Sequence, residues 1–178
     1  MATVKWVVDP FHSEVQFKVR HLMITNVTGH FNQFEADVQT EGERFMTARV
    51  SFVAKADSVN TGNEQRDLHI KSADFFDVAR YPELRFVATG FEDVDKDGSY
   101  EMFGDLTLCG VTKRITLDVE SGGIIKDPWG NTKAGFAISG KINRKDFGLS
   151  WQAFTESGAM VASEEVRIHC NIQLIKQV

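Results

Sequence analysis

The stretch from Ser13 to His21 constrains the fold most strongly, because its apolar and polar residues alternate without interruption. Val15, Phe17 and Val19 share one side of this stretch, and His21 falls on the same side. Side chains of a β-strand point alternately to opposite faces, so the pattern predicts a strand with one buried face and one face in water. Such a strand needs other strands to cover its apolar face.

The same alternation recurs along the chain and predicts roughly eight strands. Residues 27–38 read as one strand whose inward parity switches within it, which is typical of a β-bulge. Residues 48–56 place small side chains and Phe52 inward. The remaining strands are predicted near residues 84–94, 100–108, 115–119, 134–142 and 166–174.

Glycines on the inward side of these strands favour a closed barrel over two stacked sheets. Gly29, Gly104 and Gly140 have inward parity, and closure of a barrel needs tight bends and close approach of the backbone. An eight-stranded barrel is just wide enough to be filled by side chains or to hold one small ligand. The alternation alone allows both a filled core and a cavity.

One segment departs from the strand pattern and predicts a helix over about residues 63–77. Thr61 and Glu64 stand in the spacing of a capping box. An apolar stripe at helical spacing follows, formed by Leu68, Ser72, Phe75 and Phe76. Arg66 and His69 fall on a separate side. We expect this helix to lie across one mouth of the barrel with its stripe docked.

The composition is that of one ordinary globular domain, expected to span residues 1–178. The 14 Phe, against 2 Tyr and 3 Trp, supply large side chains without a polar group and suit a dry interior. The net charge of -5, without any basic cluster longer than two residues, argues against a nucleic-acid partner. Cys109 and Cys170 lie in apolar strand contexts and imply no disulfide.

No targeting or membrane-spanning segment is predicted. The N-terminal residues lack a basic region followed by an apolar run, which argues against a signal peptide. No apolar stretch reaches the roughly 18 residues of a spanning helix, so we expect no stable membrane insertion. The expected compartment is the cytoplasm, or the periplasm if a leader has been removed.

Groups that could catalyse a reaction or hold a metal are sparse. No two His share a metal-ligand spacing. Residues 93–98 begin like a calcium loop, but its twelfth position is Gly104 instead of Glu. No serine-nucleophile elbow or C-x-x-C motif occurs. We therefore expect no enzyme, metal or cofactor, with His21 acting either as a core histidine or as a polar point in a cavity lining.

If the barrel is hollow, two groups of residues are candidates for ligand binding. The wall would be formed by inward residues of the strands, namely Phe17, Val19, Phe31, Phe52 and Phe136, together with His21. The predicted helix adds Arg66, His69 and Phe75. Arg66 and His69 are three residues apart and can reach one anion together, although a solvated surface would explain them equally well.

Several motifs in one order resemble those of a known family. They are Trp6-Val7-Val8-Asp9-Pro10-Phe11-His12-Ser13 with the strand to His21; Thr61-Gly62-Asn63 with Arg66-Asp67-x-His69; Asp74-Phe75-Phe76-Asp77 with Tyr81-Pro82; Gly104-x-Leu106-Thr107-x-x-Gly110-x-Thr112; Trp129-Gly130 with Gly135-Phe136; Ile142-Asn143-Arg144-x-Asp146-Phe147-Gly148; and Glu165-Val166. In this respect residues 6–175 resemble the YceI-like proteins, a bacterial, polyisoprenoid-binding, lipocalin-like family.

The resemblance implies a lipocalin-type, all-β antiparallel barrel whose apolar cavity takes an isoprenoid or similar long-chain lipid of quinone or prenyl phosphate type. It implies binding and transport without catalysis, no metal, and a homodimer. Many members carry a secretion leader and work in the periplasm. Two alternatives stay open, a cavity enzyme or stress-response isomerase that uses His21, and an interaction module with a filled core.

Overall fold

The computed structural model describes residues 2–94, 98–153, 156 and 160–177, and most of them lie in strands. The strands are β1 (Thr3–Val8), β2 (Glu14–His21), β3 (Thr25–Phe31), β4 (Phe34–Glu41), β5 (Arg44–Lys55), β6 (Val59–Asn60), β7 (Glu83–Asp93), β8 (Ser99–Leu108), β9 (Val111–Lys126), β10 (Thr132–Asn143) and β11 (Ala162–Lys176). The helical elements are α1 (Glu64–Lys71) and the 3-10 turns η1 (Pro10–His12), η2 (Ala56–Ser58) and η3 (Arg144–Phe147). Within the described ranges, no helix is long and apolar enough to cross a membrane.

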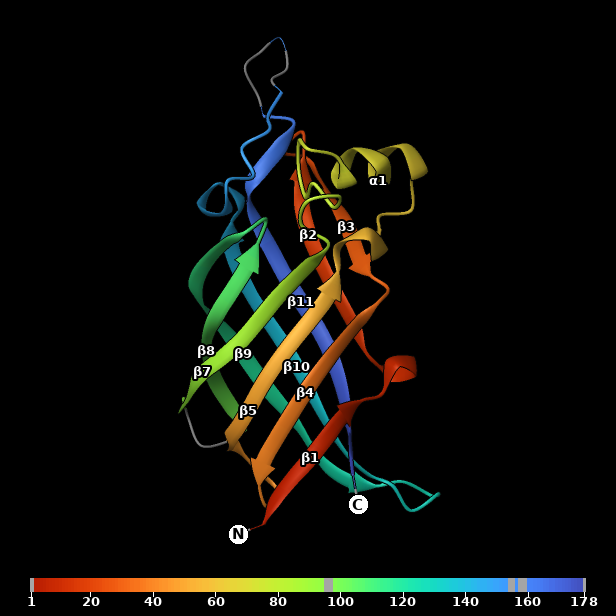
Figure 1. Ribbon diagram of the computed structural model, residues 1–178, viewed down its shortest axis with the longest axis vertical. Coiled ribbons are helices and arrows are strands. Elements are labelled where there is room, and N and C mark those ends of the chain that lie inside the picture. The colour runs from red at the N-terminus through yellow and green to blue at the C-terminus, as the bar shows by residue number, and fades with distance from the viewer. Residues whose placement is uncertain (1, 95–97, 154–155, 157–159, 178) are drawn as a thin grey trace.

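Eight strands close into an antiparallel barrel, which confirms the predicted fold class (Figure 1). Hydrogen-bonded neighbours follow the order β1-β4-β5-β7-β8-β9-β10-β11, and β11 pairs with β1 to complete the ring. Strand β11 is long enough to serve two partners along one edge, because its last residues pair with β1 and its earlier residues pair with β2. Strands β2, β3 and β6 continue the sheet from that edge.

The prediction of one bulged strand over residues 27–38 is wrong, since the segment forms two strands with different neighbours. Strand β3 pairs with β2 and β6, whereas β4 pairs with β1 and β5. The chain changes direction at Asn32 and Gln33, whose backbone groups bond to Ser58 and Lys55. The parity switch in the sequence therefore marks a break between strands.

The inward glycines leave space for large aromatic side chains to lie over the backbone of the neighbouring strand. A Cβ at Gly29 would collide with the ring of Phe17, its partner on β2. A Cβ at Gly104 would collide with Phe86 on the neighbouring strand. Each absent side chain makes room for an aromatic ring over the backbone, so the close approach expected at these positions is confirmed.

The two ends of the barrel differ. At the end that carries both termini, which we call the closed end, Phe45 packs between Trp6 and Phe136 with ring centroids 4.8 and 4.7 Å apart. Trp6 is fully buried, and its indole nitrogen donates to Thr40 Oγ1 at 2.9 Å. At the opposite end, which we call the open end, lie α1, the β2–β3 turn and residues 148–153, which follow η3 (Figure 1).

Candidate functional site: an apolar cavity in the barrel

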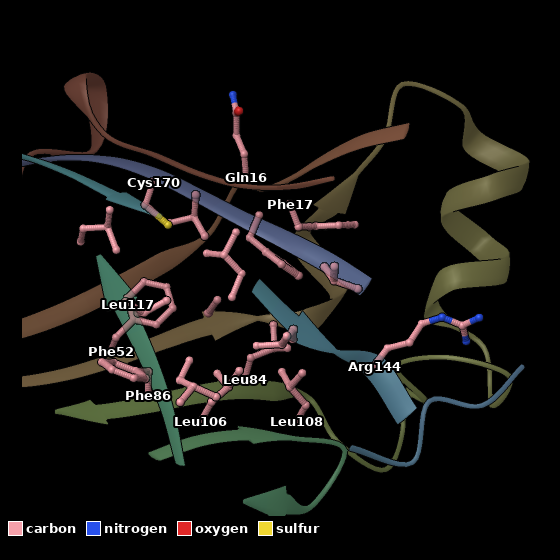
Figure 2. A pocket seen from close by; sticks show the side chains of 18 of the residues that line it. Gln16, Phe17, Phe52, Leu84, Phe86, Leu106, Leu108, Leu117, Arg144 and Cys170 are labelled. Atoms are coloured by element: carbon pink, nitrogen blue, oxygen red, sulfur yellow. The ribbon is translucent and has the colours of Figure 1, made fainter. Parts of the chain in front are cut away.

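The barrel interior is hollow and encloses a cavity of about 470 Å³. Its wall is almost wholly aliphatic and aromatic, and Figure 2 shows side chains from many strands converging on it. Among them are Phe17, Phe52, Leu84, Phe86, Leu106, Leu108 and Leu117. The cavity decides between the two alternatives that the sequence left open, because a filled core would leave no such space.

The structure places all of the predicted wall residues on the cavity surface. They are Phe17 and Val19 from β2, Phe31 from β3, Phe52 from β5 and Phe136 from β10. Phe17 and Phe31 also contact each other, with ring centroids 5.5 Å apart. Their role in binding a ligand stays a prediction.

Three aromatic rings meet at the open end. His69 packs edge-on against Phe75 at 5.1 Å and against Trp151 at 4.9 Å, and the last two lie 5.2 Å apart. The His69 Nε2 atom lies 2.9 Å from an Asp74 carboxylate oxygen, which fixes the ring. All three rings border the cavity. Trp151 lies in a stretch whose sequence has no periodicity, so its contacts with His69 and Phe75 were not predicted.

Arg66 also borders the cavity, but the fold already uses two of its donor groups. Its Nε atom donates to Thr61 Oγ1 at 2.7 Å and its Nη2 atom to the Thr61 carbonyl at 2.6 Å. His21 lies at the rim of the cavity and is exposed. The expectation of a buried His21 is therefore wrong, because β2 ends at this residue.

The helix differs from its prediction in length, cap and orientation. It ends at Lys71, and its N-cap is Asn63, whose side chain accepts the backbone N–H of Arg66. Phe75 and Phe76 follow in turns beyond the helix. Leu68 is 62% exposed, so the helical part of the predicted apolar stripe is not docked, whereas Phe75 and Phe76 border the cavity from those turns. Instead, the side that carries Arg66, His69 and Ile70 borders the cavity.

A buried arginine, Arg144, lies at the end of the cavity beside α1 (Figure 2). The sequence motifs include this residue but assign it no role. Arg144 is only 3% exposed, and it donates to the carbonyl oxygens of Leu149, Trp151, Ala162 and Ser163 at 2.7 to 3.3 Å. Burial lowers the pKa of its guanidinium, while the Glu164 carboxylate opposes that shift. Its position continues the inward parity of 134–142, a signal that could have identified it.

The polar groups of the wall are basic or neutral. Among the described residues that border the cavity there are three Arg and two His but no Asp or Glu. Arg144 is buried, whereas the remaining basic groups lie near the rim: Arg20, His21, Arg66 and His69. A wall of this kind accepts an apolar chain and, at the open end, a neutral or anionic head group.

The cysteines and carboxylates form no reactive or metal-binding cluster within the described ranges. Both cysteines are free, and burial raises the pKa of Cys170 to about 11, so this cavity thiol is protonated at neutral pH. No group of three or more His, Cys, Asp or Glu side chains is arranged to hold a metal in the part of the chain described here. Residues 95–97 of the calcium-like loop lie outside the described residues.

Comparison with known proteins identifies similar chains. The family model of the YceI-like domain matches residues 6–174. The UPF0312 protein SAS2572 of Staphylococcus aureus (strain MSSA476) is 32% identical over 166 residues, which cover 93% of this chain and 94% of that protein.

Solved structures share the fold. A Campylobacter jejuni YCEI protein superposes with a TM-score of 0.77 at 32% identity, covering 89% of this chain and 90% of that one. Burkholderia cenocepacia BcnA gives a TM-score of 0.80 at 20% identity, with coverages of 93% and 98%. A polyisoprenoid binding domain from Saccharophagus degradans gives 0.71 at 18% identity, with coverages of 97% and 98%. At these last two identities the likeness shows the fold alone.

Proposed function

The chain belongs to the YceI-like domain family, and we propose that it binds one long-chain apolar lipid, a polyisoprenoid, in the barrel cavity and carries it chemically unchanged. The observation that carries this proposal is the cavity of about 470 Å³ with its apolar wall. The name of the Saccharophagus degradans domain, which describes polyisoprenoid binding, supports the same ligand class.

The size and chemistry of the cavity suit such a ligand. Its volume falls within the range of about 300–1,000 Å³ common for small-molecule sites. Burial of apolar surface contributes about 25 cal/mol per Å², so a chain of several isoprene units binds with micromolar affinity or better after the costs of association. The closed end leaves the open end as the place for a polar head.

The open end supports a ligand of quinone or prenyl phosphate type. Arg66 and His69 border this end, and Arg144 is buried at the helix end of the cavity. A guanidinium donates to phosphate oxygens in a forked geometry and to the carbonyl of a quinone by single hydrogen bonds. We therefore expect the head group at Arg66 and His69, with the chain directed toward Phe136.

Binding without catalysis fits the state of the polar side chains. The Cys170 thiol is protonated, His69 is held by Asp74, and exposed His21 lies at the rim, away from the dry interior. An isomerase that uses His21 would need a reacting group held against that ring.

The homodimer that the resemblance implies stays a prediction, which sedimentation of the purified protein would test.

Organic extraction of the purified protein followed by mass spectrometry tests the proposal. We expect one long apolar chain per subunit in the extract. An extract without lipid, together with no uptake of added prenyl compounds by the protein, would contradict the proposed function.

A further inference from the structure

The β2–β3 turn at the open end has a backbone conformation that its sequence does not favour. Leu22 and Met23 both have positive φ, at 53° and 61°, and the backbone N–H of Ile24 donates to the His21 carbonyl at 3.1 Å. Two central residues with positive φ are the pattern of a type I′ turn, which Asn and Gly occupy in most hairpins. Side chains with a Cβ are strained there.

The same turn presents apolar side chains to solvent. Ile24 is 73% exposed and Met23 is 43% exposed. A polar turn sequence would relieve the strain and remove the exposed apolar surface together. A turn that combines a strained backbone with exposed apolar side chains gains no stability from either feature. Such a combination indicates a functional site.

This turn is tied to the rim of the cavity. The backbone N–H of Leu22 donates to the Val161 carbonyl at 2.8 Å, and the Arg20 guanidinium donates to the Met23 carbonyl at 2.8 Å. Val161, Arg20 and His21 all border the cavity. Across the open end, α1 exposes Leu68 to the extent of 62%. Apolar side chains thus project beside the opening through which a lipid would pass.

We propose that the turn at residues 22–24 docks the open end onto a lipid bilayer by inserting Met23 and Ile24 among the acyl chains. The inference rests on the proposed function, since a polyisoprenoid partitions into membranes and has to leave a bilayer to enter the cavity. Insertion beside the opening gives the chain an apolar path between bilayer and barrel. The protein's net charge of -5 makes apolar insertion the driving interaction, so a zwitterionic surface suffices.

The opposite end of the barrel also exposes apolar residues, but it offers no path to the cavity. Ile125 is 65% exposed and Trp129 is 82% exposed, on β9 and in the β9–β10 connection. That end is closed by the packing of Phe45 between Trp6 and Phe136. These residues therefore provide a matched control for exposed apolar surface as such.

The test follows loading of a pyrene-labelled prenyl alcohol from two donors, phosphatidylcholine vesicles and a cyclodextrin complex. In Met23→Gly/Ile24→Thr, we expect loading from vesicles to slow by about tenfold, because two inserting side chains are lost. Loading from cyclodextrin should be unchanged. The Tm should not fall, because glycine relieves the strain at position 23. Ile24→Thr alone provides a variant with an unaltered turn backbone, and Ile125→Thr is the control.

Three outcomes are decisive. Slower loading from vesicles alone, with Ile125→Thr unaffected, supports the docking turn. Unchanged loading from vesicles in both turn variants, or an equal loss in Ile125→Thr, overturns it. If the parent protein takes up the probe from neither donor, the proposed function fails, and flotation of parent and variants with phosphatidylcholine vesicles still decides whether the turn docks.

Discussion

At the scale of single residues, Phe52 reports whether the cavity is a binding site. It borders the cavity from β5 and packs beside Phe34, with ring centroids 6.1 Å apart. In Phe52→Arg we expect loss of the bound lipid with the barrel intact, because an unpaired charge in an apolar space costs several kcal/mol even after the surroundings relax. Lipid content by mass spectrometry and folding by circular dichroism are the measurements. Global unfolding would show that the wall is packed too tightly to hold a ligand.

Arg66 and Arg144 illustrate how two arginines on one cavity differ in role. Arg144 is buried and bonds four backbone carbonyls, so it ties residues 149–151 to the first residues of β11. Arg66 is exposed, and among the described residues its side chain bonds Thr61 alone, so it can turn toward a head group at the cost of those two hydrogen bonds. Arg66 is therefore the better residue for a binding test, since its removal leaves few buried groups unpaired.

In Arg66→Ala we expect weaker binding of a prenyl pyrophosphate and unchanged binding of the matching prenyl alcohol. Each charge-assisted hydrogen bond to the phosphate contributes about 1.5–3 kcal/mol, which corresponds to roughly ten- to a hundredfold in affinity. Titration of both ligands into parent and variant measures the difference. Equal weakening of both ligands, or of neither, would move the head-group site elsewhere.

At the scale of elements, the inward glycines make a prediction about strand packing. A side chain at Gly104 would meet the Phe86 ring and, at 2.6 Å, the Val87 carbonyl oxygen, a backbone atom that cannot move aside. We expect Gly104→Val to lower the free energy of unfolding by about 1–3 kcal/mol through overpacking. Gly90→Val is the matched control on β7, because nothing lies within 4 Å of the position that a Cβ would take there. Denaturant unfolding of both variants should show a lower free energy of unfolding for Gly104→Val than for Gly90→Val. Equal values would mean that the β-propensity of valine, and not overpacking, determines the change in stability.

The connection between β1 and β2 makes a prediction about acid stability. The Asp9 carboxylate is 6% exposed and accepts hydrogen bonds from Phe11 N, His12 Nδ1 and Lys133 Nζ. Burial acts to raise the pKa of Asp9, but these hydrogen bonds together lower it below 3.8. Because the folded-state pKa is depressed, the stability that Asp9 contributes is present above pH 3.8 and is lost as the pH falls through the folded value.

We therefore expect Asp9→Asn to cost about 1–3 kcal/mol at pH 7, as charge-assisted hydrogen bonds are weakened. The difference between parent and variant should shrink below pH 3.8. Denaturant unfolding across this range measures it. A difference that is independent of pH would assign the loss to packing or to the amide geometry.

The elements also show where sequence patterns succeed and fail. Alternation correctly predicted β2 and β5 and their inward faces, because a strand with one apolar side has one stable orientation. The helical spacing of apolar residues did not predict the orientation of α1. The side of α1 that borders the cavity carries Arg66 and His69, while Leu68 lies in water. An apolar stripe predicts the orientation of a helix only when a packed core is available to bury the stripe. A helix beside an open cavity has no such core.

The site was predictable to the same extent and for the same reason. Residues on the strands, such as Phe17 and Phe136, follow from parity and lie on the wall. The contacts of Trp151 do not, because the sequence around it has no period from which the direction of a side chain can be read. The size of the cavity was equally beyond the pattern, since alternation fixes which side chains face inward and not whether they meet.

At the scale of the whole molecule, we expect the closed end to limit the length of the lipid chain that the barrel can bind. We expect a ligand that enters at the open end to stop where Phe45 and Phe136 meet, since Trp6 lies behind them. In Phe45→Ala we expect the preferred prenyl alcohol to become longer by at least one isoprene unit, because the removed ring extends the cavity toward Trp6. Because Phe45 is only partly buried, the free energy of unfolding should fall by less than the about 3–5 kcal/mol of fully buried Phe→Ala changes, with part of the loss recovered on binding the longer chain.

Competition among prenyl alcohols of increasing length, in parent and variant, measures this preference. Phe75→Ala is the control, because this ring borders the cavity at the open end and its loss should weaken all chain lengths alike. An unchanged preference in Phe45→Ala would mean that the chain does not reach the closed end. A longer preferred chain in both variants would mean that total cavity volume, and not the position of the closed end, selects the ligand.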